Sequence, residues 1–214
     1  MKSYAYATII TKDYYLPFII RQKQMMDYLN CKYPFIVLIS NEISENTKNE
    51  LSSYNITYKT IKKVSFTHEN LNKYKDTLNK FQCFNLIEYE KILFLDADII
   101  ISKNFDFLLE TIELKNTYFY LPIGNNECAS SHEGHFYCSY IMLLKPSIDF
   151  FNKIISIATK NPCDSDEAFL NQNPQFTKNA FNKKFEENIS GEHLIHFCGL
   201  HKLHNNPDKN NFLN

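Results

Sequence analysis

Glycine is scarce in this chain, which has only four glycines in 214 residues, and the first of them is Gly124. The first hundred residues therefore cannot supply a glycine-rich phosphate loop or a dinucleotide-binding fingerprint. Arginine occurs once, tryptophan is absent, and the formal net charge is -1 without any continuous basic tract. These absences exclude a general nucleic-acid binder, because such a protein needs a basic surface to neutralise phosphates.

Long apolar runs are also missing. No stretch approaches the roughly 18 apolar residues of a membrane-spanning helix, and residues Met1 to Tyr4 lack the apolar core of a signal peptide. None of the six cysteines forms a C-x-x-C pair, which favours reduced thiols. We therefore expect a cytoplasmic protein without a membrane span, for which only peripheral association with a membrane stays open.

Segments typical of strands and helices alternate along the chain, and 44% hydrophobic residues can bury a sizeable core. Such alternation is typical of an α/β domain with a largely parallel sheet and covering helices. The expected strands are residues 4–10, 34–40, 56–61, 91–101, 118–121, 139–144 and 193–198. The expected helices are residues 14–29, with Asp13 as the N-cap, 44–54, an amphipathic 77–89, 105–109, 147–160 and 164–171. We expect one domain over residues 1–204 and a loose polar tail over residues 205–214.

The most informative stretch is Lys91 to Ile101, in which Asp96 and Asp98 interrupt a run of Ile, Leu and Phe. On extended backbone, side chains two residues apart point to the same side. Carboxylates are almost never buried unless they are paired or bound to a metal. The pattern therefore indicates a site for a hard divalent cation. Thr11 also follows a predicted strand, so it and the two aspartates can converge on one edge of the sheet.

Two other interpretations of these aspartates stay open. The strand could end at Leu95 and leave both aspartates in a solvated turn. A strand followed by D-x-D also begins the site of the aspartate-nucleophile phosphatases. In those enzymes the motif normally lies near the chain start and continues to threonine or valine, whereas here Ile99 and Ile100 follow, more than ninety residues into the chain.

Six stretches of the chain match one known family in the same order. They are Thr8 to Tyr15, Leu78 to Phe81, Leu93 to Asp98, Met142 to Ser147, Asp166 to Asn171 and His196 to Lys202. In these stretches the chain resembles the glycogenin-like glycosyltransferases, family eight of the retaining enzymes. The resemblance implies the GT-A fold, a single α/β domain whose mixed central sheet is mostly parallel and flanked by helices.

The resemblance also implies a metal site and a nucleotide site. Asp96, Asp98 and His196 would bind a manganese-like ion, a mixed oxygen and nitrogen ligand set that suits Mn²⁺ and accepts Mg²⁺. Tyr15 would stack on the base of a UDP-sugar, and Lys202 would donate to its outer phosphate. The residues implied to contact the nucleotide sugar are Ile9, Thr11, Tyr15, Lys80, Asp96, Ala97, Asp98, Ser139, Gly199 and Lys202.

Asp166, Glu167 and Lys202 are the implied catalytic residues, with Asp166 near the donor sugar and the acceptor. Each of four site residues also has a plain structural alternative. His196 on an apolar strand could be a satisfied core histidine, and Tyr15 could belong to the core. Lys80 could be a solvated lysine on a polar helix face, and Asp166 could be an exposed N-cap of the helix that follows it.

The chain departs from the family pattern mainly where the family binds the sugar. Cys138 and Tyr140 replace the asparagine and glycine that flank the serine of the N-S-G turn, so only Ser139 remains. Cys163 replaces the first aspartate of the D-x-x-D-Q segment, and Glu167 replaces its glutamine. On the nucleotide side, Lys12 stands where the family has asparagine near the base. The usual Lys-Pro-Trp is here Lys202 to His204.

The resulting prediction is a metal-dependent hexosyltransferase. It would move a hexose from a nucleotide sugar, with UDP as the favoured nucleotide, to a hydroxyl of a glycan, a lipid-linked saccharide or a protein, with retention. The departures on the sugar side leave an alternative, a degenerate transferase that binds a sugar nucleotide or a partner without turnover. The donor sugar, the acceptor and the oligomeric state do not follow from the sequence.

Overall fold

The computed structural model describes residues 3–65, 74, 76–124, 136–161, 163, 165–189 and 194–196, and of residues 124 and 194–196 it describes the backbone alone. Gly199 and Lys202, and the loop that holds Cys128, His132, Glu133 and His135, lie outside these residues. The predicted tail over residues 205–214 lies outside them as well.

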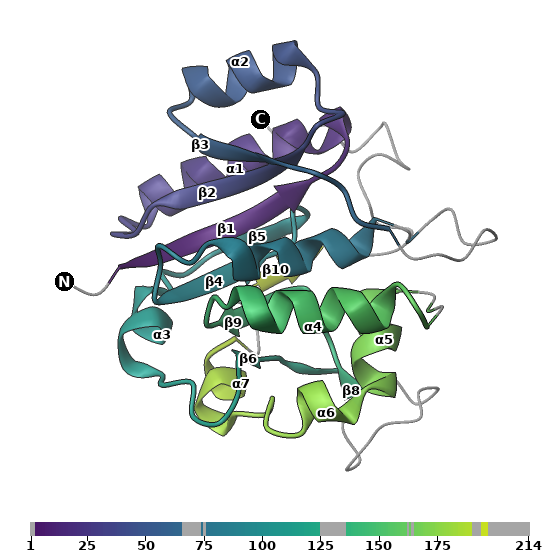
Figure 1. Ribbon diagram of the computed structural model, residues 1–214. Coiled ribbons are helices and arrows are strands. Elements are labelled where there is room, and N and C mark those ends of the chain that lie inside the picture. The colour runs from purple at the N-terminus through teal and green to yellow at the C-terminus, as the bar shows by residue number, and fades with distance from the viewer. Residues whose placement is uncertain are drawn as a thin grey trace.

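The fold is a single α/β domain around a sheet of six strands in the order β3-β2-β1-β4-β9-β6. Strands β1, β2, β3 and β4 are mutually parallel, whereas β9 runs antiparallel to both β4 and β6 (Figure 1). The strands are β1 Tyr4–Ile10, β2 Phe35–Ser40, β3 Thr57–Ile61, β4 Lys91–Leu95, β6 Phe119–Tyr120 and β9 Ile141–Leu144. The prediction of a mostly parallel, mixed sheet is confirmed.

The strands alternate their apolar side chains between two separate cores. Tyr6 and Leu93 belong to one core, whereas Ala7 and Phe94, their neighbours along β1 and β4, belong to the other. Since successive side chains of a strand face opposite sides, the central strands are apolar throughout and buried on both faces. One face packs against α1 Leu16–Tyr28, α2 Glu45–Ser53, α3 Asp106–Thr111 and α7 Lys183–Ile189. The other packs against the 3-10 helix η2 Thr77–Asn85, α4 Ile148–Ala158, α5 Asp166–Gln172 and α6 Pro174–Thr177.

Three helices begin at a serine whose hydroxyl accepts a backbone N–H bond. Ser44, Ser147 and Ser165 accept from the third residue beyond them, at 3.1–3.2 Å, and so cap α2, α4 and α5. Such caps satisfy a donor that the helix itself cannot. The predicted cap Asp13 is wrong, because Asp13 lies inside the 3-10 helix η1 Asp13–Tyr15 and accepts a bond from the backbone N–H of Ser44 at 3.0 Å.

The predicted amphipathic helix over residues 77–89 is also wrong. The segment is a 3-10 helix that ends at Asn85, and all seven residues from Leu78 to Phe84 are buried. Its polar side chains bond inward: Asn79 exchanges two 2.7 Å hydrogen bonds with the backbone of Val64, and Gln82 donates to the carbonyl of Lys62. The predicted helix would have a solvated polar face, whereas these side-chain amides are buried and hydrogen-bonded.

Two short antiparallel ladders lie outside the main sheet. One joins β5 Ile99–Ile101 to β10 Leu194–His196, with the Cα of His196 opposite that of Ile99. The other joins β7 Ile123–Gly124 to β8 Phe136–Tyr137. The last predicted strand therefore pairs with the segment that follows the two aspartates.

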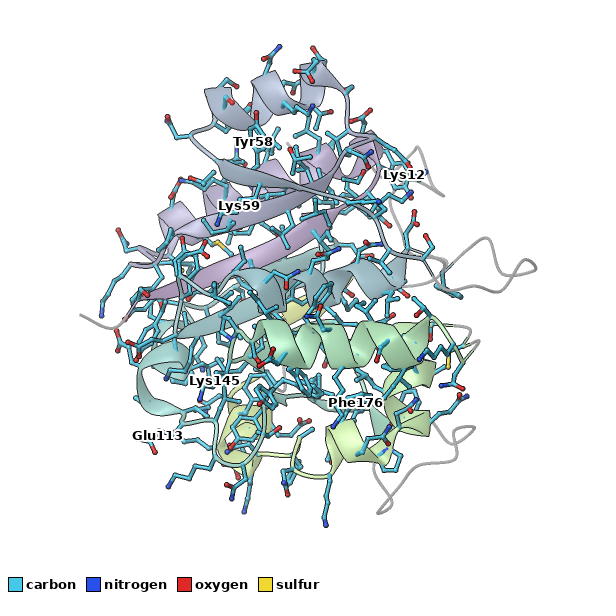
Figure 2. All side chains as sticks on the ribbon, viewed as in Figure 1. Lys12, Tyr58, Lys59, Glu113, Lys145 and Phe176 are labelled. Carbon is cyan, nitrogen blue, oxygen red and sulfur yellow. The ribbon has the colours of Figure 1, made fainter. Side chains whose placement is uncertain are left out.

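The exposed edge of the sheet is β3. Figure 2 shows Tyr58 and Lys59 on this strand and Lys12 just past the end of β1. Lys59 pairs with Glu88, and such charges on an edge strand discourage pairing with a second chain. None of the helices in the described part of the chain has the length and apolar character that a membrane crossing requires. Cys31, Cys83, Cys138 and Cys163 are free thiols, as expected.

Candidate active site

The candidate site is built at the edge of the sheet where β1 and β4 end. Thr11 follows β1, and Asp96 follows β4. Strand β9 is antiparallel, so its first residue, Ile141, pairs with the last residue of β4, and Ser139 comes to the same edge. The backbone N–H of Asp96 donates to the carbonyl of Tyr140 at 2.8 Å, which closes this edge. Residues from both halves of the chain thus meet beside the D-x-D motif.

The two aspartates lie in a turn between β4 and β5. Strand β4 ends at Leu95, and the N–H of Ile99 donates to the carbonyl of Asp96 at 3.1 Å. The expectation of extended backbone is therefore wrong, and a turn is right. The turn is not a solvated one, however: Asp98 is 4% exposed, and the side chain of Asp96 is 24% exposed. Carboxylates buried to this degree need partners or a cation.

Lys80 lies at the centre of the site. Its ammonium is 3.1 Å from Oδ1 of Asp96, 2.8 Å from Oδ2 of Asp166 and 3.0 Å from Oγ of Ser139. It also lies over the ring of Phe94 at 5.8 Å. The alternative of a solvated lysine is wrong, because the residue is 6% exposed. Lys80 therefore joins the D-x-D turn to the first residue of α5, 70 positions further along the chain.

Two opposing effects act on the pKa of the Lys80 ammonium. Burial lowers the pKa, and the charges of Asp166 and Asp96 raise it by more, so that the net pKa lies well above its ordinary value. Lys80 is therefore a permanent cation at neutral pH. A buried ion pair of this kind is expensive to form, so its presence at a sheet edge indicates a function.

Asp166 is fixed from three directions. Its carboxylate accepts a bond from the hydroxyl of Ser139 and pairs with Lys80, and its backbone N–H donates to the hydroxyl of Thr77 at 3.2 Å. Glu167 lies beside it and accepts a bond from the backbone N–H of Ser139 at 3.1 Å. The cap of α5 is Ser165, so the interpretation of Asp166 as an exposed N-cap is wrong.

Tyr15 lies beside both aspartates of the turn. Burial raises the pKa of its hydroxyl, and the hydrogen bond with Tyr14 and the charges of Tyr14, Asp98 and Asp96 add to the rise. The ring lies 4.5 Å from that of Tyr14 and also packs against the core, so its structural alternative is partly right. Thr11 is partly buried, and Ile9 lies one residue before the end of β1. Tyr15, beside the D-x-D turn, and Thr11, just past the end of β1, therefore stay predicted contacts of the nucleotide.

The donor chemistry near the turn fits a divalent cation. Two carboxylates of one turn, separated by Ala97, supply hard oxygen ligands, which suit Mg²⁺ or Mn²⁺. Among the residues whose side chains the structure describes, no group of three His, Cys, Asp or Glu side chains is placed to hold a metal ion. The third predicted ligand, His196, stands outside that search, but its backbone pairs with Ile99, one residue past Asp98. His196 therefore stays a predicted ligand.

Gln22 is a site residue that the sequence interpretation missed. It lies in α1, is fully buried, and donates from Nε2 to the carbonyls of both Asp96 and Ile99, each at 2.7 Å. The only signal in the sequence is a glutamine on the helix face that carries Leu16, Ile19 and Met26. A buried amide in such a row has to have a partner.

The departures from the family pattern have structural explanations at two positions. Cys163 is buried, and its Sγ donates to Oε1 of Gln172 at 3.3 Å. Burial raises the pKa of Cys138 to about 12, with the charges of Glu167 and Glu186 adding to the rise. Tyr140 packs against the core on one face of the sheet, whereas Cys163 belongs to the core on the other face. Cys138 and Cys163 are therefore less polar than the residues they replace, whereas Glu167 adds a charge, and Asp166 and Ser139 remain.

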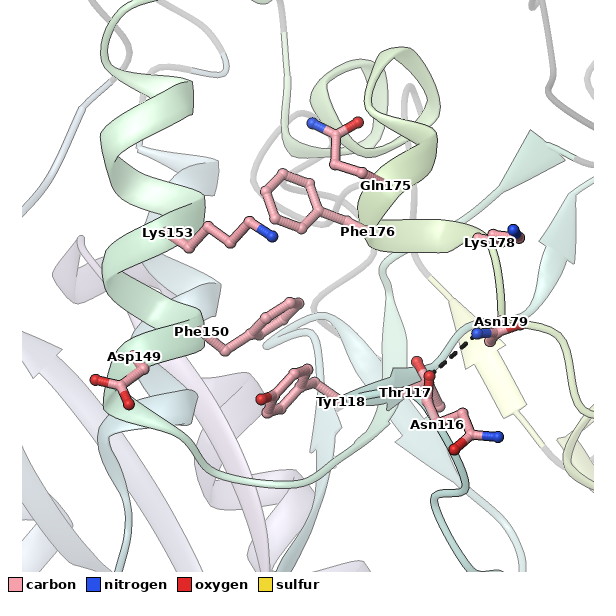
Figure 3. Close-up of a pocket in the computed structure, with 10 residues that line it drawn as sticks. All are labelled: Asn116, Thr117, Tyr118, Asp149, Phe150, Lys153, Gln175, Phe176, Lys178 and Asn179. Atoms are coloured by element: carbon pink, nitrogen blue, oxygen red, sulfur yellow. Dashed lines mark hydrogen bonds between the residues drawn. The ribbon is translucent and has the colours of Figure 1, made fainter.

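A surface hollow of about 260 Å³ lies elsewhere, between α4, α6 and the segment before β6. Figure 3 shows its aromatic wall, in which the ring of Tyr118 stacks on that of Phe150 at 4.2 Å. The ammonium of Lys153 lies 5.8 Å from the ring centre of Phe176. None of the predicted site residues that the structure describes lines this hollow, so we assign no part of the candidate site to it.

Comparisons with known proteins agree with this geometry. The sequence model described as Glycosyl transferase family 8 matches residues 6–139. An uncharacterized protein of Acanthamoeba polyphaga mimivirus is 27% identical over 98% of this chain and 86% of its own length. UDP-glucuronate:xylan alpha-glucuronosyltransferase 1 of Arabidopsis thaliana is 27% identical over 68% of this chain, and glycogenin-1 of Mus musculus is 24% identical over 75%. The chain spans only 20% and 46% of the lengths of these last two proteins.

Among solved structures, an active-site mutant of LgtC superposes with a TM-score of 0.67. The match covers 91% of this chain and 87% of that one at 14% sequence identity. A second structure describes LgtC as a galactosyltransferase in complex with donor and acceptor sugar analogues. At this identity the superposition shows a shared fold.

Proposed function

Because the chain belongs to glycosyl transferase family 8, whose sequence model covers residues 6–139, we propose that it transfers a hexose from a UDP-sugar to a hydroxyl acceptor. We further propose that a divalent ion assists the transfer and that the configuration of the sugar is retained. The observation that carries this proposal is the position of Lys80, which pairs with Asp96 of the D-x-D turn and with Asp166 of α5.

The fold and the class of chemistry are those of the family. The architecture is that of the GT-A glycosyltransferases, and the chain is a hexosyltransferase that uses a nucleotide sugar. The phosphatase alternative is therefore wrong. The identity of the donor, the role of a metal and the acceptor are the parts that we propose.

The nucleotide is proposed to lie against the ends of β1 and β4. Tyr15, half-buried beside the D-x-D turn, offers a ring on which the base can stack, and stacking on a base contributes roughly 1–3 kcal/mol. Thr11 and the backbone at Ile9 would contact the base from β1. Gly199 and Lys202 stay predicted contacts of the diphosphate.

Asp96 and Asp98, with His196 as the predicted third ligand, would hold the ion. When bound, the ion supplies positive charge next to the diphosphate and so stabilises the charge that develops on the leaving nucleotide. The protein's own part is to present two carboxylates from one short turn. It also keeps the ammonium of Lys80 charged at the same edge.

On the sugar side, the proposed roles belong to Asp166, Glu167 and Ser139. The bond between the anomeric carbon and the diphosphate oxygen breaks, and its electron pair stays with the nucleotide. The acceptor oxygen bonds to that carbon, and its proton passes to the departing diphosphate. A carboxylate near the sugar can orient hydroxyls and stabilise the positive charge that develops there. Asp166 is suited to this role because Lys80, Ser139 and Thr77 fix its position.

The acceptor is proposed to be a hydroxyl of a glycan, with lipid-linked saccharides and protein hydroxyls as the other classes. The names of two relatives support a saccharide, since one acts on xylan and the other is a glycogenin. Both relatives are much longer than the matched segment, so their substrates only suggest which acceptors to test first.

A donor screen tests the proposed function directly. The protein is incubated with Mn²⁺ and a panel of nucleotide sugars, with and without pooled saccharide acceptors, and release of the nucleotide is measured. We expect slow hydrolysis of one UDP-hexose and faster release with an acceptor. Tight UDP binding without turnover of any donor would instead identify a degenerate transferase, and the absence of both would overturn the proposal.

Asp98→Ala tests the metal. We expect the variant to lose Mn²⁺-dependent UDP binding, because one of the two carboxylates in the turn is removed. Asp149→Ala, at an exposed position in the first turn of α4, is the matched control and should bind as the unchanged protein does. Calorimetry with UDP in excess Mn²⁺ measures both, and an unchanged affinity of Asp98→Ala would remove the motif from the metal site.

A further inference from the structure

Gln22 reaches from a helix in front of the motif to both ends of the D-x-D turn. One hydrogen on its Nε2 is directed to the carbonyl of Asp96 and the other to that of Ile99, each at 2.7 Å. The turn closes on itself through the 3.1 Å bond from the N–H of Ile99 to the carbonyl of Asp96. A single side-chain amide therefore fastens the two residues that flank Ala97 and Asp98.

This arrangement has a cost in free energy. Gln22 is fully buried in a helix face that otherwise presents Leu16, Ile19 and Met26. Its Oε1 is buried and has no hydrogen-bond partner among the residues that the structure describes. An unsatisfied buried acceptor is unfavourable, so an apolar side chain of similar length would suit the helix packing better. The glutamine is best explained by what its donors hold.

We propose that Gln22 is a positioning residue of the metal site. By fixing the carbonyls of Asp96 and Ile99, it sets the direction in which the carboxylates of Asp96 and Asp98 leave the turn. This inference rests on the proposed function, because it assumes that the two carboxylates bind a divalent ion. Groups that orient metal ligands typically change metal affinity 10- to 100-fold when they are removed.

The position of Gln22 in α1 adds a second consequence. Helix α1 begins at Leu16, immediately after Tyr15, the residue proposed to stack on the base. Helix α1 therefore carries Gln22, which holds the D-x-D turn, and begins directly after Tyr15, the proposed nucleotide contact. If a bound donor displaces Tyr15, helix α1 would transmit this displacement to the D-x-D turn, because Gln22 lies less than two helical turns from Tyr15.

Gln82 offers a matched control. It is a second buried glutamine, 8% exposed, whose Nε2 also donates to a backbone carbonyl, that of Lys62 at 2.9 Å. It has no contact with the turn among the bonds of the described residues. Gln22→Met and Gln82→Met both keep the length of the side chain and remove its donors. Both should lower the melting temperature, whereas only Gln22→Met should change the metal site.

The experiment measures Mn²⁺ binding rather than activity. Free Mn²⁺ is titrated into each protein with saturating UDP and followed by electron paramagnetic resonance, and thermal unfolding is recorded in EDTA. We expect Gln22→Met to bind Mn²⁺ about 10- to 100-fold more weakly and Gln82→Met to bind it normally. If Gln22→Met does not fold, Gln22→Asn replaces it, since its shorter amide can reach only one of the two carbonyls.

Each result decides between the two hypotheses. Equal Mn²⁺ affinity in the unchanged protein and the folded Gln22 variant would overturn the positioning role and leave the proposed function intact. Equal weakening in the Gln82 variant would also overturn it, because the loss would then follow stability alone. If the unchanged protein binds no Mn²⁺, the proposed metal site itself falls, together with this inference.

Discussion

Two aspartates in this fold occupy similar positions and have different surroundings. Asp106 and Asp166 are each the first residue of a short helix, α3 and α5, and each is 3% exposed. Asp106 accepts bonds from the hydroxyl of Tyr6 at 3.0 Å and from the backbone N–H of Lys32 at 2.9 Å. Asp166 is held by the ammonium of Lys80 and the hydroxyl of Ser139.

The difference lies in where each network ends. The bonds of Asp106 come from neutral donors, and burial keeps the pKa of Tyr6 well above its ordinary value, so that the tyrosine stays a donor. The network of Asp166 continues through Lys80 to Asp96, whose side chain is 24% exposed. A buried carboxylate closed by neutral donors fastens the fold, whereas one that leads through a cation to the surface can respond to a ligand.

Removing the cation should have the largest effect. Lys80→Met leaves Asp96 and Asp166 without their shared partner, and breaking a buried ion pair from one side costs about 3–5 kcal/mol. We expect a fall in Tm of roughly 6–20 °C, together with loss of donor turnover. Thermal unfolding checks this, with Lys32→Met as the control, since the ammonium of Lys32 pairs with Glu110 at the surface. An unchanged Tm would show that the two carboxylates do not depend on Lys80.

The pH dependence of this contribution follows from the pKa of Lys80, which is raised above its ordinary value of 10.5. A raised pKa means that the stabilisation is complete below pH 10.5 and is lost only as the pH rises through the higher value in the folded protein. Unfolding experiments between pH 7 and 9 should therefore give the same difference in Tm between Lys80→Met and the unchanged protein.

Asp166→Asn should separate catalysis from stability. The amide keeps the shape and can still accept a bond from Ser139, whereas it removes the negative charge beside the proposed sugar site. We expect the rate of donor hydrolysis to fall by about 100-fold or more, a typical effect of one electrostatic group, with a smaller loss of Tm than in Lys80→Met. A rate within threefold of the unchanged protein would contradict the catalytic role of Asp166.

The matching substitution Asp106→Asn should have the opposite profile. The amide keeps one acceptor oxygen for the N–H of Lys32 but removes the charge that strengthens the bonds from Lys32 and Tyr6, at a cost of about 1–3 kcal/mol. We expect a fall in Tm of roughly 2–12 °C and an unchanged rate of turnover per folded molecule. A lower rate with an unchanged Tm would place Asp106 in the functional network and remove the contrast.

The smallest effect concerns two thiols, that of Cys31 near Asp106 and that of Cys138 near Asp166. Burial raises the pKa of Cys138 to about 12 and that of Cys31 to about 11. Since the thiolate is the reactive form, alkylation of both should be slow at pH 8 and rise about tenfold per pH unit. Mass spectrometry of iodoacetamide-treated protein measures each site. Faster labelling of Cys138 after UDP and Mn²⁺ are added would show that the sugar side opens on binding.

Sequence patterns predict most of the fold and the outline of the site. The buried strands read as unbroken apolar runs because both faces are covered, and serines mark the starts of α2 and α4. The D-x-D motif stands out because two carboxylates follow such a run. Ser139 and Asp166 are predicted from the family resemblance, and the structure brings both of them to Lys80.

The errors arise where distant residues decide the local structure. The segment over residues 77–89 has the spacing of an amphipathic helix, but the carboxylates of Asp96 and Asp166 draw Lys80 inward, and the backbone of Val64 does the same for Asn79. Gln22 goes unnoticed because its partners lie more than 70 positions away. Local periodicity carries no information on such pairings.

The Lys80 network also spans the limit of the matched family segment. That segment ends at residue 139, so Asp96 and Lys80 lie inside it and Asp166 lies outside. The ammonium of Lys80 therefore joins a carboxylate from the matched segment to one from beyond it. A substitution that moves the start of α5 away from the sheet edge would therefore also leave Lys80 with one carboxylate fewer, and so change the surroundings of Asp96.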